Sequence, residues 1–253
     1  MRFLVAIPLY NEETYIERVL ACAKNFADDI LVVNDGSTDS GAAKARAMGV
    51  EVIDHPTNYG YGRGLRDAFD YAARRDFDVV ITMDADLQHL PRYIPSFLWA
   101  IPDYDIVSGS RYLVPQPEDT SAPGERRQIN SAITDILNHH TGYGLTDAFC
   151  GFKAYKVASL KHLDLREDGY AMPLELWIQA AAKGLTVREI PVSLIYVDPT
   201  RTFGQNLDDA KRRLAYYKAV IDREIKRAGL APAGEMLTCC CGGADEICCT
   251  PKA

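Results

Sequence analysis

Short apolar runs alternate with helical segments through the first third of this chain, and this alternation limits the folds open to it. The strand-like runs are Phe3–Pro8, Ile30–Val33, Glu51–Asp54 and Val79–Met83. The segments between them repeat their apolar residues at helical spacing. Strands that alternate with helices form parallel sheets, because each crossover helix returns the chain to the same edge. We therefore expect an α/β fold with a mostly parallel central sheet and helices on both faces.

Three helices are expected between and after these strands. The first covers 12–26, with an apolar face made of Ile16, Val19, Leu20, Ala23 and Phe26. The second covers Gly41–Met48. The third follows a glycine-rich turn at 58–64 and buries Leu65, Ala68, Phe69 and Ala72.

The second half of the chain is less regular. Helices are predicted over 126–140, 172–183 and roughly 205–228. The other expected features are a surface loop at Pro115–Pro123, an irregular strand at 147–153 and a strand pair over Thr186–Val197 that breaks at Pro191. The apolar stripe of the last helix consists of Leu207, Ala210, Leu214, Tyr217, Ile221 and Ile225.

The composition limits the class of protein. The 253 residues are 47% hydrophobic, enough for one large domain, which we place at 1–228. A net charge of −7 argues against nucleic acid as a partner. No apolar run reaches the roughly 18 residues of a membrane span, and the run before Pro8 is too short for a signal peptide. We therefore expect a cytoplasmic protein.

The seven cysteines fall into two groups. Cys22 and Cys150 are isolated, and we expect them to be reduced residues of the core. The other five lie at 239–241 and 248–249, in a spacing that matches no zinc motif. We expect 229–253 to be a disordered, cysteine-rich tail.

Two carboxylates and an amide follow the strand at 79–83. Asp84, Asp86 and Gln88 stand at alternate positions where that strand should end. Hard oxygen ligands at this spacing suit Mg²⁺ or Mn²⁺ that keeps positions open for substrate phosphates. The alternative is an acidic turn without a metal.

Polar turns also follow the first two strands, at 8–12 and at 34–37. In parallel sheets, ligands bind beyond the carboxyl ends of the strands. Three polar turns on the same edge therefore predict a single cleft.

These motifs together resemble the family 2 glycosyltransferases of the GT-A fold, and within them the dolichol-phosphate mannose synthase branch. The resemblance covers roughly residues 3–228. The matching segments are Ile7–Glu12, Val33–Asp39, Asn58–Gly64, Asp84–His89, Gly109–Tyr112, Asp147 and Gly151–Lys153. Each motif alone is weak, but the ordered set is specific.

The resemblance implies a nucleoside-diphosphate sugar as donor. Asp35 would accept a hydrogen bond from a base N–H, and Arg111 would contact the donor phosphates. By resemblance Asp86 and Gln88 bind the metal directly, and Asp84 serves the metal or the donor. The full expected donor set is Pro8, Tyr10, Glu12, Asp35, Arg63, Asp84, Ala85, Arg111 and Lys153. The alternatives are that Asp35 caps a turn, that Tyr10 is core and that Arg111 forms a surface ion pair.

The resemblance also implies a polyprenyl monophosphate as acceptor. Its phosphate is already anionic at neutral pH, so a single in-line displacement with inversion needs no general base. Lys153 and Arg201 are the candidates for binding phosphates. We expect the catalytic residues to be Asp86, Arg201 and Glu175, of which Glu175 would orient the acceptor or act as base for a hydroxyl acceptor. The alternative for Glu175 is a helix-start carboxylate.

Some residues depart from the branch. Gln205-Asn206 replaces its usual small hydroxylic residue and lysine, and Asn34 replaces a common second aspartate. The membrane helices that many relatives carry at the C-terminus are absent from this sequence. Three rival functions therefore stay open: a glycosyltransferase with a saccharide or hydroxyl acceptor, a nucleotidyltransferase and a non-catalytic sugar-nucleotide binding module. The nucleotidyltransferase would need a glycine-rich loop directly after the first strand, where Pro8–Glu12 stands.

The segment at 205–228 is both basic and amphipathic. A basic amphipathic helix can lie against an anionic membrane surface, near a lipid acceptor. Its four acids dilute the charge, so the sequence favours a helix packed on the sheet, and peripheral membrane contact is the second expectation. The cations are Lys211, Arg212, Arg213, Lys218, Arg223, Lys226 and Arg227.

Overall fold

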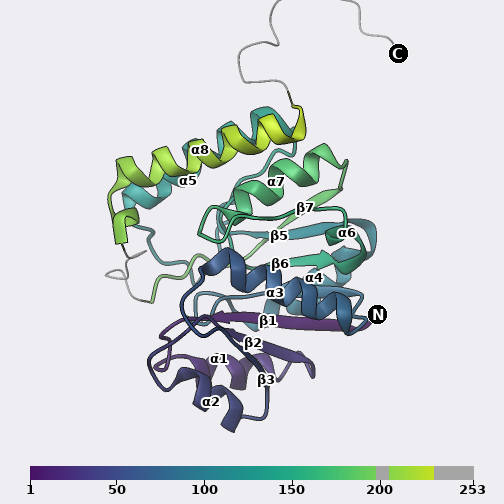
Figure 1. The fold of residues 1–253 in the computed structure, drawn as a ribbon, viewed down its shortest axis with the longest axis vertical. Helices are drawn as coiled ribbons and strands as arrows, with labels where there is room; N and C mark the ends of the chain where they lie inside the picture. Colours follow the sequence, from purple (N-terminus) through teal and green to yellow (C-terminus); the bar gives the residue numbers. More distant parts are fainter. Residues whose placement is uncertain (198–204, 231–253) are drawn as a thin grey trace, which may run out of the picture.

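A seven-stranded sheet forms the centre of the molecule, in the order β3-β2-β1-β4-β6-β5-β7. The computed structural model describes residues 1–197 and 205–230 (Figure 1). All strand pairs are parallel except the two that β6 makes. The predicted α/β fold is thus confirmed. The strands are β1 (Phe3–Leu9), β2 (Ile30–Asn34), β3 (Glu51–Asp54), β4 (Val79–Thr82), β5 (Ile106–Ser110), β6 (Lys153–Lys156) and β7 (Val187–Pro191).

Helices cover both faces of the sheet because both faces of its inner strands are apolar. Successive residues of β1 enter opposite cores: Leu4 packs in one cluster and Val5 in the other. The first cluster includes residues of α3 (Tyr61–Arg74), α5 (Gly124–Thr141), α6 (Val157–Leu160), α7 (Met172–Ala182) and α8 (Ala210–Ala228). The second includes residues of α1 (Ile16–Ala23), α2 (Gly41–Ala47) and α4 (Ile94–Ala100). Figure 1 shows α5, α7 and α8 together at the end of the molecule where β5 and β7 lie.

The reversed strand β6 lies between β4 and β5. Lys153, its first residue, is paired with Thr82, the last residue of β4. Since β6 runs against its neighbours, the loop that leads into it arrives at the carboxyl edge of the parallel strands. Residues 147–152 therefore reach the same edge as the polar turns after β1, β2 and β4.

The last helix, α8, has well-defined ends. The Asp209 carboxylate accepts a hydrogen bond from Arg212 N at 2.8 Å and so caps the first turn. Gly229 ends the helix with a φ of +67°, a conformation that suits glycine. The expected helix at 205–228 is therefore a 3₁₀ turn, Gln205–Asp208, followed by α8.

Several expected elements differ in the structure. The helix predicted over 12–26 is shortened to α1, and Phe26 is 37% exposed rather than buried. Cys22 is exposed, contrary to the prediction, whereas Cys150 is buried as predicted. Only the first of two predicted strands in Thr186–Val197 forms, as β7. The chain beyond it bonds to the 116–120 loop instead, with Leu194 N donating to the Asp119 carboxylate at 2.7 Å.

The helices α4 and α6 and the strand β5 form where the sequence pattern gave no expectation. The strand expected at 147–153 forms instead at Lys153–Lys156, as β6. Among residues 1–197 and 205–230, no helix is long and apolar enough to cross a bilayer. The predicted tail at 231–253 and the expected phosphate ligand Arg201 lie outside the described residues.

Candidate active site

The turn after β4 holds its own acidic residues in place. Asp86 accepts hydrogen bonds from Gln88 N at 3.1 Å and from the Gln88 side-chain amide at 2.6 Å. Leu87 between them has a positive φ of 65°, which a tight turn imposes on it. Asp86 is 6% exposed, while the Asp84 side chain is 33% exposed. The turn therefore offers the Asp84 carboxylate to solvent and keeps Asp86 close to the backbone.

His89 locks the start of this turn. Its Nδ1 accepts a hydrogen bond from Asp84 N at 2.9 Å, so the ring carries its hydrogen on Nε2. Burial lowers the pKa of His89 to about 4. The ring is therefore neutral near pH 7, and its 3.7 Å approach to the Asp84 carboxylate is not an ion pair. The ring stacks on Phe152, with centroids 5.2 Å apart.

Gly151, in the loop before β6, lies directly under Asp84. A Cβ at Gly151 would stand 2.9 Å from both Asp84 carboxylate oxygens and from the Tyr61 hydroxyl. Thr82 Oγ1 donates to the Gly151 carbonyl at 2.7 Å, which fixes the loop to the end of β4. Only glycine leaves room for the carboxylate here.

The donor chemistry of this turn suits a divalent metal. Asp84, Asp86 and Gln88 all carry oxygen donors, which Mg²⁺ and Mn²⁺ prefer. The structure directs the amide nitrogen of Gln88 toward Asp86, so its oxygen is the end left to face a ligand. Within the described residues, no cluster of three or more His, Cys, Asp or Glu side chains could hold a metal. Two carboxylates fit an ion that completes its shell with water and substrate phosphates.

Asp35, at the end of β2, binds the glycine-rich turn. Its carboxylate accepts hydrogen bonds from Tyr59 N and Gly60 N, both at 2.8 Å. It also bonds to His55 Nδ1 at 2.7 Å, and His55 Nε2 bonds to Asp67 at 2.8 Å. The contacts fit the alternative in which Asp35 caps a turn. The turn it holds is also the one that carries Tyr61 to Asp84.

Sequence reasoning does not single out His55 or Asp67, although both belong to this site. His55 directly follows β3, just as Asp35 directly follows β2, and this position was the available signal. Arg63 Nε donates to Asp67 at 2.9 Å, so the expected donor ligand Arg63 is joined to the same chain of contacts.

The turn after β1 joins the same edge. Tyr10 is 47% exposed, which excludes the alternative that it belongs to the core. Asn11 N donates to Ser37 Oγ at 3.0 Å, and the Asn11 side chain accepts from Thr38 N at 2.8 Å. Pro8 and Glu12 are half-buried on either side of Tyr10, and Ala85 is buried beside the acidic residues.

Arg111 forms a buried ion pair rather than a surface one. Its guanidinium donates to both Asp147 oxygens, at 2.6 and 2.9 Å. Burial by itself raises the pKa of Asp147, but Arg111 and the Asn130 amide outweigh it and lower that pKa to about 2. Glu189 accepts from Asp147 N at 3.0 Å and fixes the loop. The Arg111 side chain keeps 14% of its surface exposed.

Two expected site residues are buried. Lys153 is 1% exposed, donates to the Cys150 carbonyl and lies 5.4 Å from the Trp177 ring centre. Burial lowers its pKa. Glu175 is fully buried, in the first turn of α7. Neither side chain is therefore open to solvent.

The charged residues around the acidic turn lie close to one another. The charges of Asp86, Arg111, Lys153 and Asp147 all act on the His89 ring. Asp35 is joined to them through the glycine-rich turn, because Gly60 binds Asp35 and the next residue, Tyr61, donates to Asp84 at 3.5 Å. The turns after β1, β2 and β4 and the loop before β6 therefore meet at one edge of the sheet, and a single cleft at this edge stays a prediction.

Two relatives with assigned activities are similar to this chain in sequence. The chain is 31% identical over 205 residues to an undecaprenyl-phosphate mannosyltransferase of Micrococcus luteus, covering 77% of this chain and 84% of that protein. It is 30% identical over 227 residues to a UDP-N-acetylglucosamine–dolichyl-phosphate N-acetylglucosaminyltransferase of Methanococcus voltae, covering 79% and 88%. Both relatives are named for sugar transfer to a polyprenyl phosphate.

Solved structures share the fold. Glucosyl-3-phosphoglycerate synthase from Mycobacterium tuberculosis, with Mn²⁺, UDP-glucose and phosphoglyceric acid, matches with a TM-score of 0.69 at 19% identity. The match covers 92% of this chain and 81% of that chain. The fold and the relatives define the protein as a glycosyltransferase of the GT-A fold. Residues 4–164 match the model of glycosyl transferase family 2, and the chain belongs to that family.

Proposed function

We propose that this enzyme moves a hexose from a nucleoside-diphosphate sugar to a polyprenyl phosphate, with inversion at the anomeric carbon and with Mg²⁺ or Mn²⁺. The names of the two relatives support the lipid phosphate as acceptor. The observation that carries the choice of acceptor is the burial of Glu175. This residue was the candidate base for a hydroxyl acceptor, and a phosphate acceptor needs no base.

The donor would lie across the turns after β1, β2 and β4. Asp84 and Asp86 would hold the metal, with the Gln88 amide oxygen beside them. When bound, the metal neutralises the diphosphate and makes it a better leaving group. Tyr10 offers an exposed ring for the base, and Glu12 a carboxylate for the ribose hydroxyls. Arg111, held by Asp147, presents a fixed cation to the phosphates.

The transfer step is a single displacement. A phosphate oxygen of the acceptor forms a bond to the anomeric carbon, while the bond from that carbon to the nucleoside diphosphate breaks. The electron pair leaves with the diphosphate, and no proton has to be removed from the nucleophile. The chain's own contribution is to position the two phosphates in line and to stabilise charge on the leaving group.

A membrane-surface location follows from a lipid acceptor, and α8 supports it only in part. Arg213 is 3% exposed and pairs with Glu125. Arg223 and Arg227 pair with carboxylates of the protein interior. The exposed cations of α8 are Lys211, Arg212, Lys218, Arg223, Lys226 and Arg227, so two of the six are those that pair with interior carboxylates.

The test is a transfer assay with the purified full chain and Mn²⁺. GDP-mannose, UDP-glucose and UDP-N-acetylglucosamine are each offered with and without a short polyprenyl phosphate. We expect a lipid-linked product from one donor and only in the presence of the lipid phosphate. Asp86→Asn should lower the rate by about 10³-fold, since it removes a charge that the metal requires. Equal donor turnover without the lipid, or transfer to a hydroxyl compound, would refute the proposal.

A further inference from the structure

We propose that Glu175 is a positioning residue for the nucleotide-sugar side of the cleft. It acts through the loop at 164–169, against which the glycine-rich turn of α3 rests. The inference builds on the proposed function, because it concerns how the donor site of that enzyme keeps its shape.

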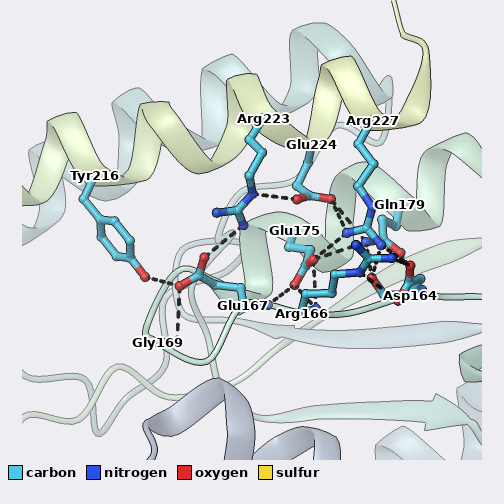
Figure 2. Close-up of polar contacts among 10 residues, drawn as sticks. All are labelled: Asp164, Arg166, Glu167, Gly169, Glu175, Gln179, Tyr216, Arg223, Glu224 and Arg227. Carbon is cyan, nitrogen blue, oxygen red and sulfur yellow. Dashed lines mark hydrogen bonds and ion pairs between the residues drawn. The ribbon is translucent and has the colours of Figure 1, made fainter.

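The Glu175 carboxylate is occupied by the backbone of this loop. Arg166 N donates to its two oxygens at 3.0 and 2.9 Å, and Glu167 N donates at 2.7 Å (Figure 2). The side chain has no exposed surface. A carboxylate held in this way cannot approach an acceptor hydroxyl unless the loop moves first. The Glu175 carboxylate instead holds the loop in place through these backbone hydrogen bonds.

Side chains of α8 contact the Glu175 carboxylate from the side opposite the loop. Arg227 Nη1 donates to Glu175 at 3.0 Å and to Glu224 at 3.1 Å, and the Gln179 amide reaches the same two carboxylates. Glu224 is 1% exposed. Two buried carboxylates are stable only when they are paired and hydrogen-bonded, so Arg227 and Gln179 make the arrangement possible. Figure 2 shows these side chains meeting between α7 and α8.

A second set of contacts from α8 holds the middle of the loop. The Tyr216 hydroxyl donates to the Glu167 carboxylate at 2.5 Å, and Arg223 pairs with the same carboxylate at 2.9 Å (Figure 2). Gly169 lies so close to Tyr216 that a Cβ there would be 2.6 Å from the hydroxyl oxygen. The loop is therefore fixed at both its start and its middle.

The far side of the loop carries the glycine-rich turn. A Cβ on Gly60 would lie 2.4 Å from the Asp168 carbonyl oxygen, and one on Gly62 would lie 2.3 Å from the Glu167 carbonyl oxygen. Arg63 N donates to that Asp168 oxygen at 3.2 Å. The two backbones are thus in direct contact, with no side chain between them to absorb a shift.

The glycine-rich turn also contacts the proposed donor site. The same turn donates Gly60 N to Asp35 and carries the Tyr61 hydroxyl toward Asp84. Tyr61 also stacks on Tyr170, the residue after the loop, with ring centroids 5.8 Å apart. A displaced loop would move the turn, and with it both carboxylates that face the nucleotide sugar. Glu175 therefore sets the geometry of the donor side without touching the substrate.

The experiment separates donor binding from turnover. Glu175→Gln keeps the volume but loses one acceptor and the charge that Arg227 requires. We expect the donor KM to rise about tenfold while kcat changes less than about threefold, because misplaced binding groups weaken the complex. Affinity for UDP and GDP with Mn²⁺, measured by calorimetry without acceptor, should fall by the same factor. A base role predicts the reverse: kcat lower by about 10²-fold or more with donor affinity unchanged.

A matched control and a milder variant complete the test. Asp105→Asn removes a similar anchor at the opposite edge of the sheet, where Asp105 accepts from Thr186 N at 2.8 Å and from Ser159 Oγ at 2.6 Å. It should leave nucleotide affinity unchanged. Tyr216→Phe loosens the same loop from α8 and should lower nucleotide affinity by a smaller factor than Glu175→Gln. It takes the place of Glu175→Gln in the test if that variant does not fold.

The outcomes are distinct. If the wild type binds neither nucleotide, the proposed function fails. If the wild type binds one of them and both loop variants bind it equally well, the positioning role of Glu175 is overturned. A kcat loss without a change in affinity also overturns it.

Discussion

The two halves of the molecule use their acidic residues in opposite ways. In the first half, Asp84 and Asp86 lie at a strand end, and Asp86 is held by its own neighbour two residues away. In the second half, Glu175 is held by Arg227 over a separation of 52 residues, and Glu167 by Tyr216 over 49. Asp84 of the first half thus reaches solvent at the edge of the sheet, whereas Glu175 and Glu167 of the second half hold the loop at 164–169.

The chemical type of a residue alone does not determine its role in this protein. Asp86 and Glu175 carry the same group, but only Asp86 belongs to the edge where a substrate can bind. Burial and partners decide between the roles. The second half contributes to the site through the loops that it fixes, above all the loop at 147–152, which supports Asp84, and the loop at 164–169, which supports the glycine-rich turn.

The largest effect is expected where the two halves touch. Gly151→Ala would place a Cβ 2.9 Å from the Asp84 carboxylate, and the displaced carboxylate should lower kcat/KM by about 10²-fold. A Mn²⁺ titration of the transfer rate should show a raised metal requirement. Gly124→Ala is the matched control, since a Cβ there meets nothing within 4 Å. Equal rates for both variants would mean that the second half does not shape the metal site.

The effect expected from the buried pair in the second half is on stability rather than on activity. Asp147→Asn leaves Arg111 without its ion partner and should cost about 3–5 kcal/mol of unfolding free energy at pH 7. The pKa of Asp147 is lowered from 3.8 to about 2 in the folded protein. The ionised group therefore stabilises the fold above about pH 4, and this contribution is lost as the pH falls toward 2.

Urea unfolding of wild type and variant across this pH range measures the contribution. The difference in unfolding free energy between wild type and Asp147→Asn should become smaller as the pH falls below 4. The exposed Asp103 provides the control, and Asp103→Asn should leave the unfolding free energy within about 0.5 kcal/mol at every pH. A difference that does not depend on pH would show that the pair contributes through packing rather than charge.

The smallest effect is expected from the local contacts of the first half. His55→Ala removes the bonds to Asp35 and Asp67, and nucleotide affinity should fall about tenfold, the magnitude of one hydrogen bond. His55→Asn retains a donor near Nδ1 and should recover most of the loss. Calorimetry with UDP and GDP measures both. Unchanged nucleotide affinity in His55→Ala would show that the nucleotide site does not depend on the bonds of His55 to Asp35 and Asp67.

The sequence was sufficient to predict the parallel strands β1 to β4 and the acidic turn. Local signals carried these predictions: apolar strands, polar strand ends and a glycine-rich turn, as at Val79–Met83 and Asn58–Gly64. The alternation predicted the helix bearing Leu65 and Phe69, both of which are buried. The prediction for Phe26 was wrong because helical periodicity was extended past Ala23, where α1 ends. The prediction for Cys22 was wrong because that residue lies on the exposed face of α1.

The second half could not be predicted in the same way because its structure depends on distant contacts. Nothing near Lys153 in the sequence indicates that Trp177 lies 5.4 Å from its ammonium group. Nothing near Glu175 indicates that α8 covers it. The strand expected after Pro191 is absent because the chain there bonds to residues 119 and 120, about seventy-five positions earlier, instead of to a strand.

The reversed strand β6 has a consequence for the order in which the chain acquires its structure during synthesis. The ribosome delivers β1 to β4 first, and β4 then has β1 on one side only. Lys153, which meets Thr82 on the other side, is 71 residues further along. Until Lys153 emerges, the mostly apolar strand β4 remains an open edge, which is a template for pairing with other chains. The acidic turn is therefore synthesised before the strand that covers the open edge of β4, and during this interval the nascent chain is most exposed to pairing with other chains.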